Sequence, residues 1–388
     1  MRFLNWRLGD SRGAVRACIL VLLTALMGAT PSVAEQISRE CSLVDLSIQS
    51  GRDSFAYAIN ERGQVIGQSN TAEGGAHAFL WTAQGGMIDL GTLGGRDSIA
   101  LAVNERGQVV GYSDTTDYGL PHAFLWTAQG GMVDLGTLGG GFSFAVAVNE
   151  RGQTIGRSFT ADGSVHAFVW TAQGGMVDLG TLGGSNSVAV AVNERGQVVG
   201  NSVTTDGSEH AFVWTAQDGM IDLNPLGDRS SAAAVNERGQ VAGYTDTTDF
   251  VWTAQGGMVD LGNLGGGAGP PSAFNERGQV VGQSFAADGN GRAFSWTAQG
   301  GMVDLGTLGG SYSNASTVNE RGQVVGYSFT AEGSAHAFVW TAQGGMIDLG
   351  TLGGSFSNAS AVNERGQVVG GSTTSDGSVH AVVWACPG

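Results

Sequence analysis

Short runs of apolar residues alternate with glycine-containing turns along most of the chain. In one stretch, residues 143–148 are small and apolar, the turn Asn149-Glu150-Arg151-Gly152 interrupts them, and residues 153–158 resume the apolar pattern. Two more runs follow at 166–171 and 176–182, separated by Ala-Gln-Gly-Gly. Glycine supplies the positive φ that hairpin turns need, and Val, Ile, Phe and Trp favour strands. The pattern predicts four short antiparallel strands and nearly excludes helix.

This four-strand pattern returns about every 44 residues. Each third run ends in a string similar to His-Ala-Phe-Val-Trp, and we number the repeats one to eight by their tryptophans, which are Trp81, Trp126, Trp170, Trp214, Trp252, Trp296, Trp340 and Trp384. Four short antiparallel strands are the unit of a β-propeller blade, and closed propellers of this size are common. The sequence therefore predicts an all-β fold, an eight-bladed β-propeller of four-stranded antiparallel blades.

The two ends of the repeat array complement each other. Repeat eight stops at Cys386-Pro387-Gly388 and lacks a fourth strand, whereas Leu43–Leu46 matches the fourth strand of repeat seven, residues 346–349, in residue type and order. We expect residues 41–49 to complete the last blade and so close the ring at its one weak seam. An open solenoid would instead need capping repeats at both ends.

Cysteine usage supports closure. Beyond Cys18 only Cys41 and Cys386 remain, and both fall on the hairpin of the split blade. In an oxidising compartment they are expected to form a disulfide. Closing so long a loop contributes about 5 kcal/mol at most in the loop-entropy picture.

The N-terminus has the features of a secretory signal peptide. Arg2, Arg7, Arg12 and Arg16 precede an apolar run from Ala17 to Met27, and Ser32-Val33-Ala34 follows. The run is shorter than the roughly 20 residues of a membrane span. We expect residues 1–34 to be removed and residues 35–388 to form a single repeat domain, a monomer secreted to the extracellular space or the periplasm.

The repeated strings resemble a known family. Asn-Glu-Arg-Gly-Gln-Val-Val-Gly, then His-Ala-Phe-Val-Trp, then Met-Val-Asp-Leu-Gly-Thr-Leu-Gly-Gly is similar to the bacterial extracellular HAF repeats, over essentially the whole mature chain. The resemblance implies a secreted or surface-associated protein and no particular reaction. Repeat five departs from the pattern by omitting about five residues, including the His-Ala pair, and repeat six has Arg292 in place of histidine.

The charge of the chain is strongly negative. Lysine is absent and the net charge is −16, which becomes −19 when residues 1–34, with four arginines and one aspartate, are removed. Such a field repels phosphate backbones, so we expect no nucleic-acid partner. The Asn-Glu-Arg-Gly turns carry no net charge and are expected to form a solvated rim.

Metal ligands do not converge in the sequence. One histidine per repeat lies on a separate blade, so we expect the histidines, and the aspartates of the Asp-Leu-Gly strings, to make structural hydrogen bonds and no metal site. The candidate calcium ligands are Asp114, Asp117, Asp246 and Asp249, which have no EF-hand or nonapeptide spacing. No other cofactor is expected.

The differences between repeats are confined to two of the four connections. The Asn-Glu-Arg-Gly and Ala-Gln-Gly-Gly turns are almost invariant and in an up-and-down blade share one face of the disc, so the variable connections lie on the other face. Aromatic rings stack on sugars or anchor protein contacts, and polar side chains fix orientation. The candidate ligand-binding residues are Arg96, Asp97, Tyr118, Phe142, Asn186, Arg229, Tyr312 and Phe356. We expect a non-catalytic module that binds an extracellular glycan or protein.

Three alternatives stay open. Loop tolerance after recent duplication would also produce the variation. Near-identical repeats would suffice for a structural envelope or matrix component. A polysaccharide hydrolase or lyase would need off-repeat charged residues such as Glu209, Arg229 or Arg292, and no Gly-x-Ser-x-Gly, His-Glu-x-x-His, phosphate-loop or Rossmann motif is present.

Overall fold

The computed structural model describes residues 41–46, 53–116, 119–224, 227 and 229–386, so the predicted signal peptide and residues 47–49 lie outside it. Within these residues the protein is all-β and contains no helix. Accordingly, the described part of the chain has no helix long and apolar enough to cross a membrane. All strands belong to the compact unit Ser42–Cys386.

Repeats one to seven have the four strand positions that the apolar runs predict, with the first strand of repeat six divided in two, and repeat eight has three strands beside the N-terminal strand. The first strands are β2 (Ser54–Ile59), β6 (Gly94–Val103), β10 (Gly139–Val148), β14 (Gly183–Val192), β18 (Ser230–Val235), β22 (Gly265–Gly267) with β23 (Pro271–Phe274), β27 (Gly309–Val318) and β31 (Gly353–Val362). The second strands are β3 (Val65–Asn70), β7 (Val109–Thr115), β11 (Thr154–Thr160), β15 (Val198–Thr204), β19 (Val241–Thr245), β24 (Val280–Ala286), β28 (Val324–Thr330) and β32 (Gln367–Thr374). The third strands are β4 (Ala76–Thr82), β8 (Pro121–Thr127), β12 (Val165–Thr171), β16 (Glu209–Thr215), β20 (Asp249–Thr253), β25 (Gly291–Thr297), β29 (Ala335–Thr341) and β33 (Val379–Ala385). The fourth strands are β5 (Gly86–Asp89), β9 (Gly131–Asp134), β13 (Gly175–Asp178), β17 (Gly219–Asp222), β21 (Gly257–Asp260), β26 (Gly301–Asp304), β30 (Gly345–Asp348) and, from the N-terminal end, β1 (Ser42–Asp45).

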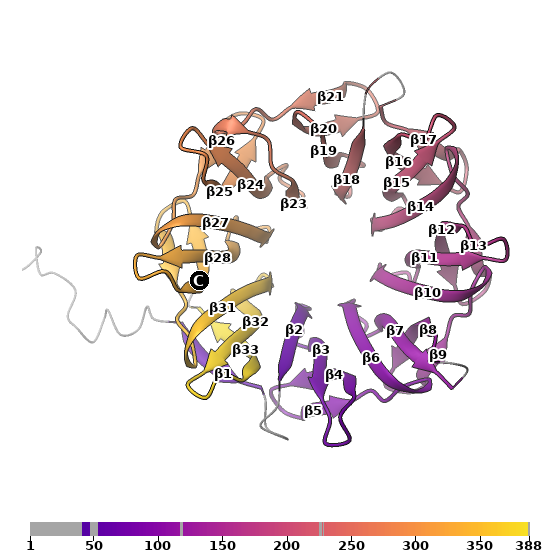
Figure 1. The fold of residues 1–388 in the computed structure, drawn as a ribbon, viewed down its shortest axis with the longest axis horizontal. Coiled ribbons are helices and arrows are strands. Elements are labelled where there is room, and N and C mark those ends of the chain that lie inside the picture. Colours follow the sequence, from indigo (N-terminus) through magenta and orange to yellow (C-terminus); the bar gives the residue numbers. More distant parts are fainter. Residues whose placement is uncertain (1–40, 47–52, 117–118, 225–226, 228, 387–388) are drawn as a thin grey trace, which may run out of the picture. The chain divides into compact units, whose positions relative to one another are not determined.

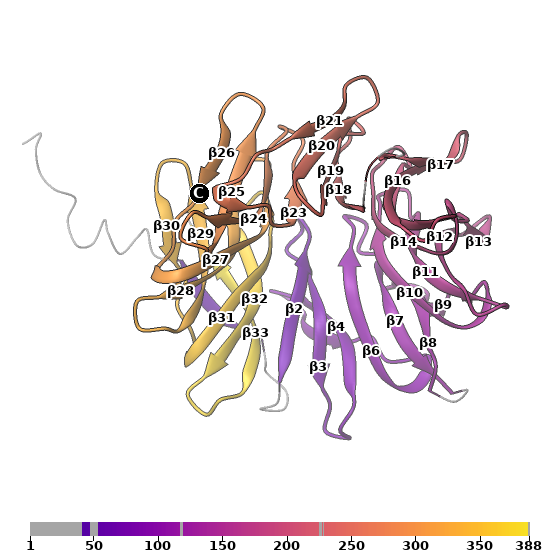
Figure 2. The ribbon, with the colours of Figure 1, turned by 45° about the horizontal axis from the view of Figure 1, so that its top comes forward.

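Within a repeat the four strands pair antiparallel in sequence order, and successive repeats stand side by side (Figures 1 and 2). Strand β1 pairs antiparallel with β33, with Ser42 opposite Ala385 and Asp45 opposite Val382. Cys41 and Cys386 are disulfide-bonded, as predicted.

A glycine in the second strand of every repeat permits close packing on the first strand. In repeat three, a Cβ atom on Gly156 would lie 1.9 Å from the carbonyl oxygen of Phe144. Any side chain there would force β10 and β11 apart, at the irregularity in pairing between Ala145 and Ala147.

The apolar core lies between repeats. Ile155, Val169 and Leu179 of repeat three pack with Val198 and Phe212 of repeat four in one buried cluster. The same kind of cluster joins repeats eight and one, where Val369, Ala381 and Val383 pack with Leu46, Ala56, Val65 and Phe79. No repeat buries its apolar face alone, which is typical of repeat proteins.

Polar contacts join the repeats at the Asn-Glu-Arg-Gly turns. In repeat three, Gly152 ends the turn at φ 78° and Asn149 Oδ1 accepts the amides of Arg151 and Gln153. Asn149 Nδ2 donates to the Asn193 carbonyl of repeat four at 3.0 Å, and the Glu150 amide donates to the Glu194 carboxylate at 2.7 Å.

This pattern extends through all the repeats. The amide-to-glutamate bond occurs at eight junctions, including Glu364 to Glu61, and the asparagine-to-carbonyl bond at seven, including Asn363 to Asn60. The expectation of a solvated rim was wrong for the asparagines, which are buried, and for the glutamates, which are half-buried. Only the arginines of these turns are exposed.

The repeated histidines and aspartates bond to each other. In six repeats a histidine Nδ1 lies 2.8 Å from an aspartate Oδ2, in the pairs His77–Asp89, His122–Asp134, His166–Asp178, His210–Asp222, His336–Asp348 and His380–Asp45. Asp178 Oδ1 also accepts the Gly180 amide at 2.7 Å, as the equivalent aspartates do in other repeats. The predicted hydrogen-bonding role of both residue types is confirmed.

We expect Asn193→Ala to lower the free energy of unfolding by about 2–3 kcal/mol, because it leaves the Arg195 and Gln197 amides without partners. It also removes one of the two bonds to the buried Asn236 carbonyl, which keeps only the Gly239 amide. Urea denaturation measures this loss. The exposed Arg195 in the same turn provides the control, since Arg195→Ala should change stability by no more than about 0.5 kcal/mol. Equal effects of the two changes would contradict a structural role for the asparagine.

Candidate functional site

The invariant turns and the variable connections lie at opposite ends of the strands. Phe142, which the sequence placed in a connection between repeats, lies near the start of strand β10, and this strand ends at the turn 149–152. The invariant turns share one face, because Arg321 of one turn type and Thr341, Ala342 and Gln343 of the other line the same pocket. The opposite strand ends meet as well, because Phe142, near the start of β10, and Val165, at the start of β12, line another pocket.

This second pocket, the aromatic pocket, has a volume of about 520 Å³ and lies between repeats three and four. It is lined by Phe142, Phe144, Arg157, Phe159, Val165, Asn186 and Val188. All seven residues occupy positions that vary between repeats. For example, the paired residues Phe144 and Arg157 correspond to Ile99 and Tyr112 in repeat two and to Asn314 and Tyr327 in repeat seven.

Aromatic contacts hold the walls of the pocket in place. The rings of Phe142 and Phe159 are 5.1 Å apart and tilted by 52°. Phe144 meets Tyr112 of repeat two edge-on at 5.1 Å, and the guanidinium of Arg157 lies 5.0 Å from the Phe144 ring centre. A cation above an aromatic face is favourable and fixes both side chains. The pocket is therefore apolar, with one positive charge and one amide at its edge.

Asn186 has a structural bond in addition to its place in the pocket. Its Oδ1 accepts the Val165 amide at 3.0 Å, and at the equivalent position Asp97 Oδ1 accepts the Ala76 amide at 2.7 Å. A short polar side chain here ties the start of one repeat to the third strand of the preceding repeat.

The other predicted site residues that the structure describes are not among the residues that line the aromatic pocket. Arg96 donates to the Gly74 carbonyl, and Arg229 forms an ion pair of 3.1 Å with Glu209. Tyr312 donates to Gln283 at 2.6 Å and packs on Tyr327 and Phe329, and burial raises its pKa to about 12. Phe356 is 38% exposed on repeat eight. Tyr118 lies outside the described residues.

Of the predicted residues, Phe142 and Asn186 therefore lie together in the lining of the aromatic pocket. The site prediction did not include Phe144, Arg157, Phe159, Val165 or Val188, which line it too. Variation at alternate strand positions, and not only in the loops, was the signal that could have identified most of them.

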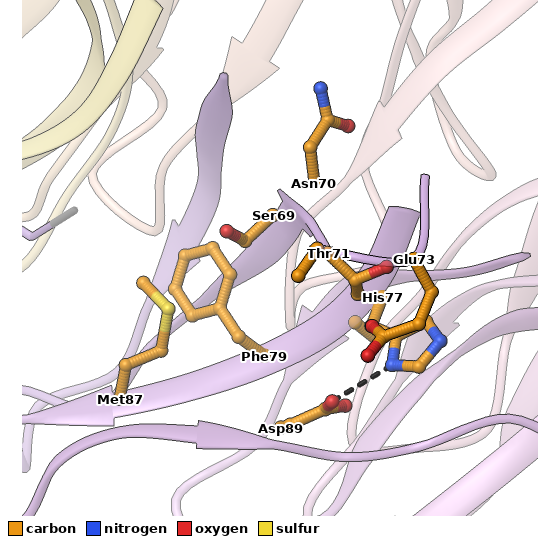
Figure 3. A pocket seen from close by; sticks show the side chains of 10 residues that line it. Ser69, Asn70, Thr71, Glu73, His77, Phe79, Met87 and Asp89 are labelled. Atoms are coloured by element: carbon orange, nitrogen blue, oxygen red, sulfur yellow. Dashed lines mark hydrogen bonds and ion pairs between the residues drawn. The ribbon is translucent and has the colours of Figure 1, made fainter. Parts of the chain in front are cut away.

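A smaller pocket, of about 240 Å³, lies beside the His77–Asp89 pair of repeat one, with Ser69, Glu73, Phe79 and Met87 in its lining (Figure 3). Serine, histidine and aspartate recur together in other repeats. In repeat three, however, the buried Ser158 hydroxyl accepts the Leu138 amide at 2.8 Å and lies 3.2 Å from the Phe142 carbonyl. The Ser158 hydroxyl therefore makes structural hydrogen bonds to the backbone of Leu138 and Phe142.

The calcium candidates do not form a cluster. Among the residues that the structure describes, no three His, Cys, Asp or Glu side chains are placed to hold a metal ion. Burial, with the nearby charge of Asp97, raises the pKa of Asp114, Asp246 is exposed, and Asp117 lies outside the described residues.

Asp249 is buried where the other repeats have alanine. It pairs with Tyr244 in the register that joins Arg157 to Ala167 in repeat three, and its Oδ1 has no hydrogen-bond partner. Its Oδ2 accepts only a long bond, 3.4 Å, from the Gly269 amide. Burial raises the pKa of this carboxyl from 3.8 to about 7.

No family model matches the chain, and no curated protein matches its sequence. Solved structures match in fold. The β-propeller domain of the Trilobed protease from Pyrococcus furiosus has a TM-score of 0.52 at 11% identity, over 78% of this chain and 100% of that domain. A puromycin hydrolase has a TM-score of 0.51 at 15% identity, and a puromycin-hydrolyzing peptidase of Mycobacterium tuberculosis has 0.52 at 15%.

These matches cover 88% and 89% of this chain, which spans 60% of the length of each puromycin-hydrolysing protein. At such identities the likeness extends to the fold alone. Together with the four-stranded antiparallel sheets, it defines the protein as a β-propeller.

We expect Asp249→Ala to stabilise the protein more at pH 8 than at pH 4.5. The folded pKa is above the unfolded one, so stability falls as pH rises from about 4 to about 7 and the penalty is complete above that, up to about 4 kcal/mol. Alanine removes the penalty and matches the other repeats. Urea denaturation at the two pH values measures the difference.

The control for this change is Asp246→Ala, which removes an exposed carboxylate three residues away. It should leave the pH dependence of unfolding unchanged. The idea fails if Asp249→Ala gives the same stability change at both pH values.

Proposed function

We propose that the chain is a secreted eight-bladed propeller, of the kind that the His-Ala-Phe repeats typify, in which the N-terminal strand completes the last blade. Three contacts between the chain ends support closure: the β1–β33 pairing, the His380–Asp45 pair at 2.8 Å, and the bond of 2.8 Å from Glu364 to Glu61. Each reproduces a contact made within or between the other repeats. The disulfide is in keeping with an oxidising, extracellular or periplasmic location.

The function we propose is non-catalytic binding of an extracellular glycan or protein through the variable face. The observation that carries this proposal is the aromatic pocket, whose lining consists entirely of positions that differ between repeats. Without selection, differences between repeats would be scattered over all positions that tolerate substitution. Here three phenylalanines, an arginine and an asparagine at variable positions surround one cavity.

The size and chemistry of the pocket favour a glycan. A volume of about 520 Å³ is within the range of small-ligand sites. Apolar ring faces can pack against the C–H face of a sugar, and Arg157 and Asn186 are placed to bond its hydroxyls. A protein partner would use the same cavity to hold one anchoring side chain.

The repeats themselves supply the substitutions for a test. Phe142→Asn, Phe144→Val, Arg157→Asn and Phe159→Val give repeat three the residues of repeat four at these positions, which occur naturally in this fold. We expect glycan-array binding by the oxidised protein to fall by at least tenfold with unchanged melting temperature, because the stacking rings are lost.

The matched control is Phe356→Asn, which makes the same kind of change at the equivalent position of repeat eight and should leave binding intact. Undiminished array binding by the four-residue variant would refute the assignment of the pocket. An array without any hit would direct the search to protein partners.

A further inference from the structure

The pocket that Arg321 and Gln343 line, on the face of the invariant turns, lies between repeats six and seven. Its volume is about 470 Å³, and its lining includes Arg277, Gln279, Ser295, Arg321, Trp340 and Gln343. Since the aromatic pocket belongs to the opposite strand ends, the two sites are separate.

Ser295, in the lining of this pocket, departs from the repeat. The other seven repeats have leucine or valine at its position, namely Leu80, Leu125, Val169, Val213, Val251, Val339 and Val383. The smaller serine leaves space between the repeats, where a branched apolar side chain is buried elsewhere.

The serine also changes the bonding of a repeated glutamine. Gln279 Nε2 donates to Ser295 Oγ at 2.8 Å. The usual bond from the turn asparagine to this glutamine, 2.7 Å in repeat three, lengthens to 3.3 Å between Asn275 and Gln279. A polar group thereby faces a cavity that in other repeats is filled by hydrocarbon.

Two exposed arginines flank the pocket. Arg277 and Arg321 form no ion pair with any described residue. The acidic neighbours in their own turns are engaged elsewhere: Glu276 accepts the Glu237 amide at 2.7 Å and Glu320 accepts the Glu276 amide at 2.8 Å. The guanidinium groups of Arg277 and Arg321 are therefore available to bind an anionic ligand.

We propose that this pocket binds a saccharide unit that carries a carboxylate. Two guanidinium groups match the geometry and charge of a carboxylate. The half-buried Trp340 offers a surface for a sugar ring, and the amides of Gln279 and Gln343 can bond its hydroxyls. The strong negative charge of the whole protein opposes anions at long range, so recognition depends on these short contacts.

The test uses glucuronate as the probe and glucose and acetate as references, in an NMR titration of the oxidised protein. We expect saturable binding of glucuronate and at least tenfold weaker binding of both references. Arg277→Gln with Arg321→Gln should weaken glucuronate binding at least tenfold, and salt should weaken it in the wild type. Arg151→Gln, in the equivalent turn of repeat three, should leave it unchanged.

Two substitutions of Ser295 distinguish the effect of the pocket's volume from the effect of the serine hydroxyl. Ser295→Val restores the residue of the other repeats and fills the pocket, so binding should be lost, whereas Ser295→Ala keeps the space and should retain part of it. Equal binding of glucose or acetate, or unaltered glucuronate binding by the Ser295→Val protein, would overturn the proposal.

This site and the aromatic pocket are tested independently. The variant that gives repeat three the residues of repeat four should bind glucuronate as the wild type does. A loss of array binding together with intact glucuronate binding would support both assignments, and either can fail alone.

Discussion

The structure depends on backbone amides that only the next repeat can satisfy. In each Asn-Glu-Arg-Gly turn the glutamate amide points away from its own repeat and is bound by the glutamate carboxylate of the following one, from Glu61 to Glu105 onward and from Glu364 back to Glu61. A hydrogen bond to a charged group contributes about 1.5–3 kcal/mol, and an isolated repeat would lose this bond while its apolar face stayed open to water. The repeats are therefore stable as a set.

This constraint explains where the sequence is free to change. The asparagine of an invariant turn bonds within its own turn and to the next repeat, so a substitution there breaks bonds inside one repeat and at one junction. At the other strand ends, single contacts such as Asn186 to Val165 can be made by aspartate or asparagine, or omitted, and bulky rings such as Phe142 take the same position. Variation concentrated at one face thus follows partly from the physics of the other face. Ser295 is informative for the same reason, because it is a change on the constrained face.

The fold could be predicted because its signals are local and repeated. Glycine turns, apolar runs and the period determine four strands per unit, and the match of Leu43–Leu46 to residues 346–349 correctly placed β1 beside β33. The aromatic pocket could not be derived in the same way. Its walls come from alternate positions on β10, β11 and β14, and which alternate set faces the neighbouring repeat depends on the bulge between Ala145 and Ala147. Tyr312 and Arg229 stand out in the sequence, yet in the structure Tyr312, on β27, bonds to Gln283, and Arg229 pairs with Glu209.

The sequence suggested a weak junction at the chain ends, yet the structure gives that junction the same bonds as the others. Repeats eight and one are joined by Asn363 to Asn60, Glu364 to Glu61 and Ala381 to the Ser54 hydroxyl, a full set of the usual bonds. Between repeats five and six, Asn236 bonds within its own turn, and Gly269 stands where other repeats have a bonding serine. At this junction the bond runs in the opposite direction, because the Asp249 carboxylate of repeat five accepts from the Gly269 amide of repeat six, at 3.4 Å. Asp249 is a buried carboxyl, and its pKa is raised. Since local opening starts where stabilising contacts are fewest, we expect the junction between repeats five and six to open before the junction of the chain ends. Opening there should become easier as pH rises from about 4 to about 7, the range in which the buried Asp249 carboxyl loses stability.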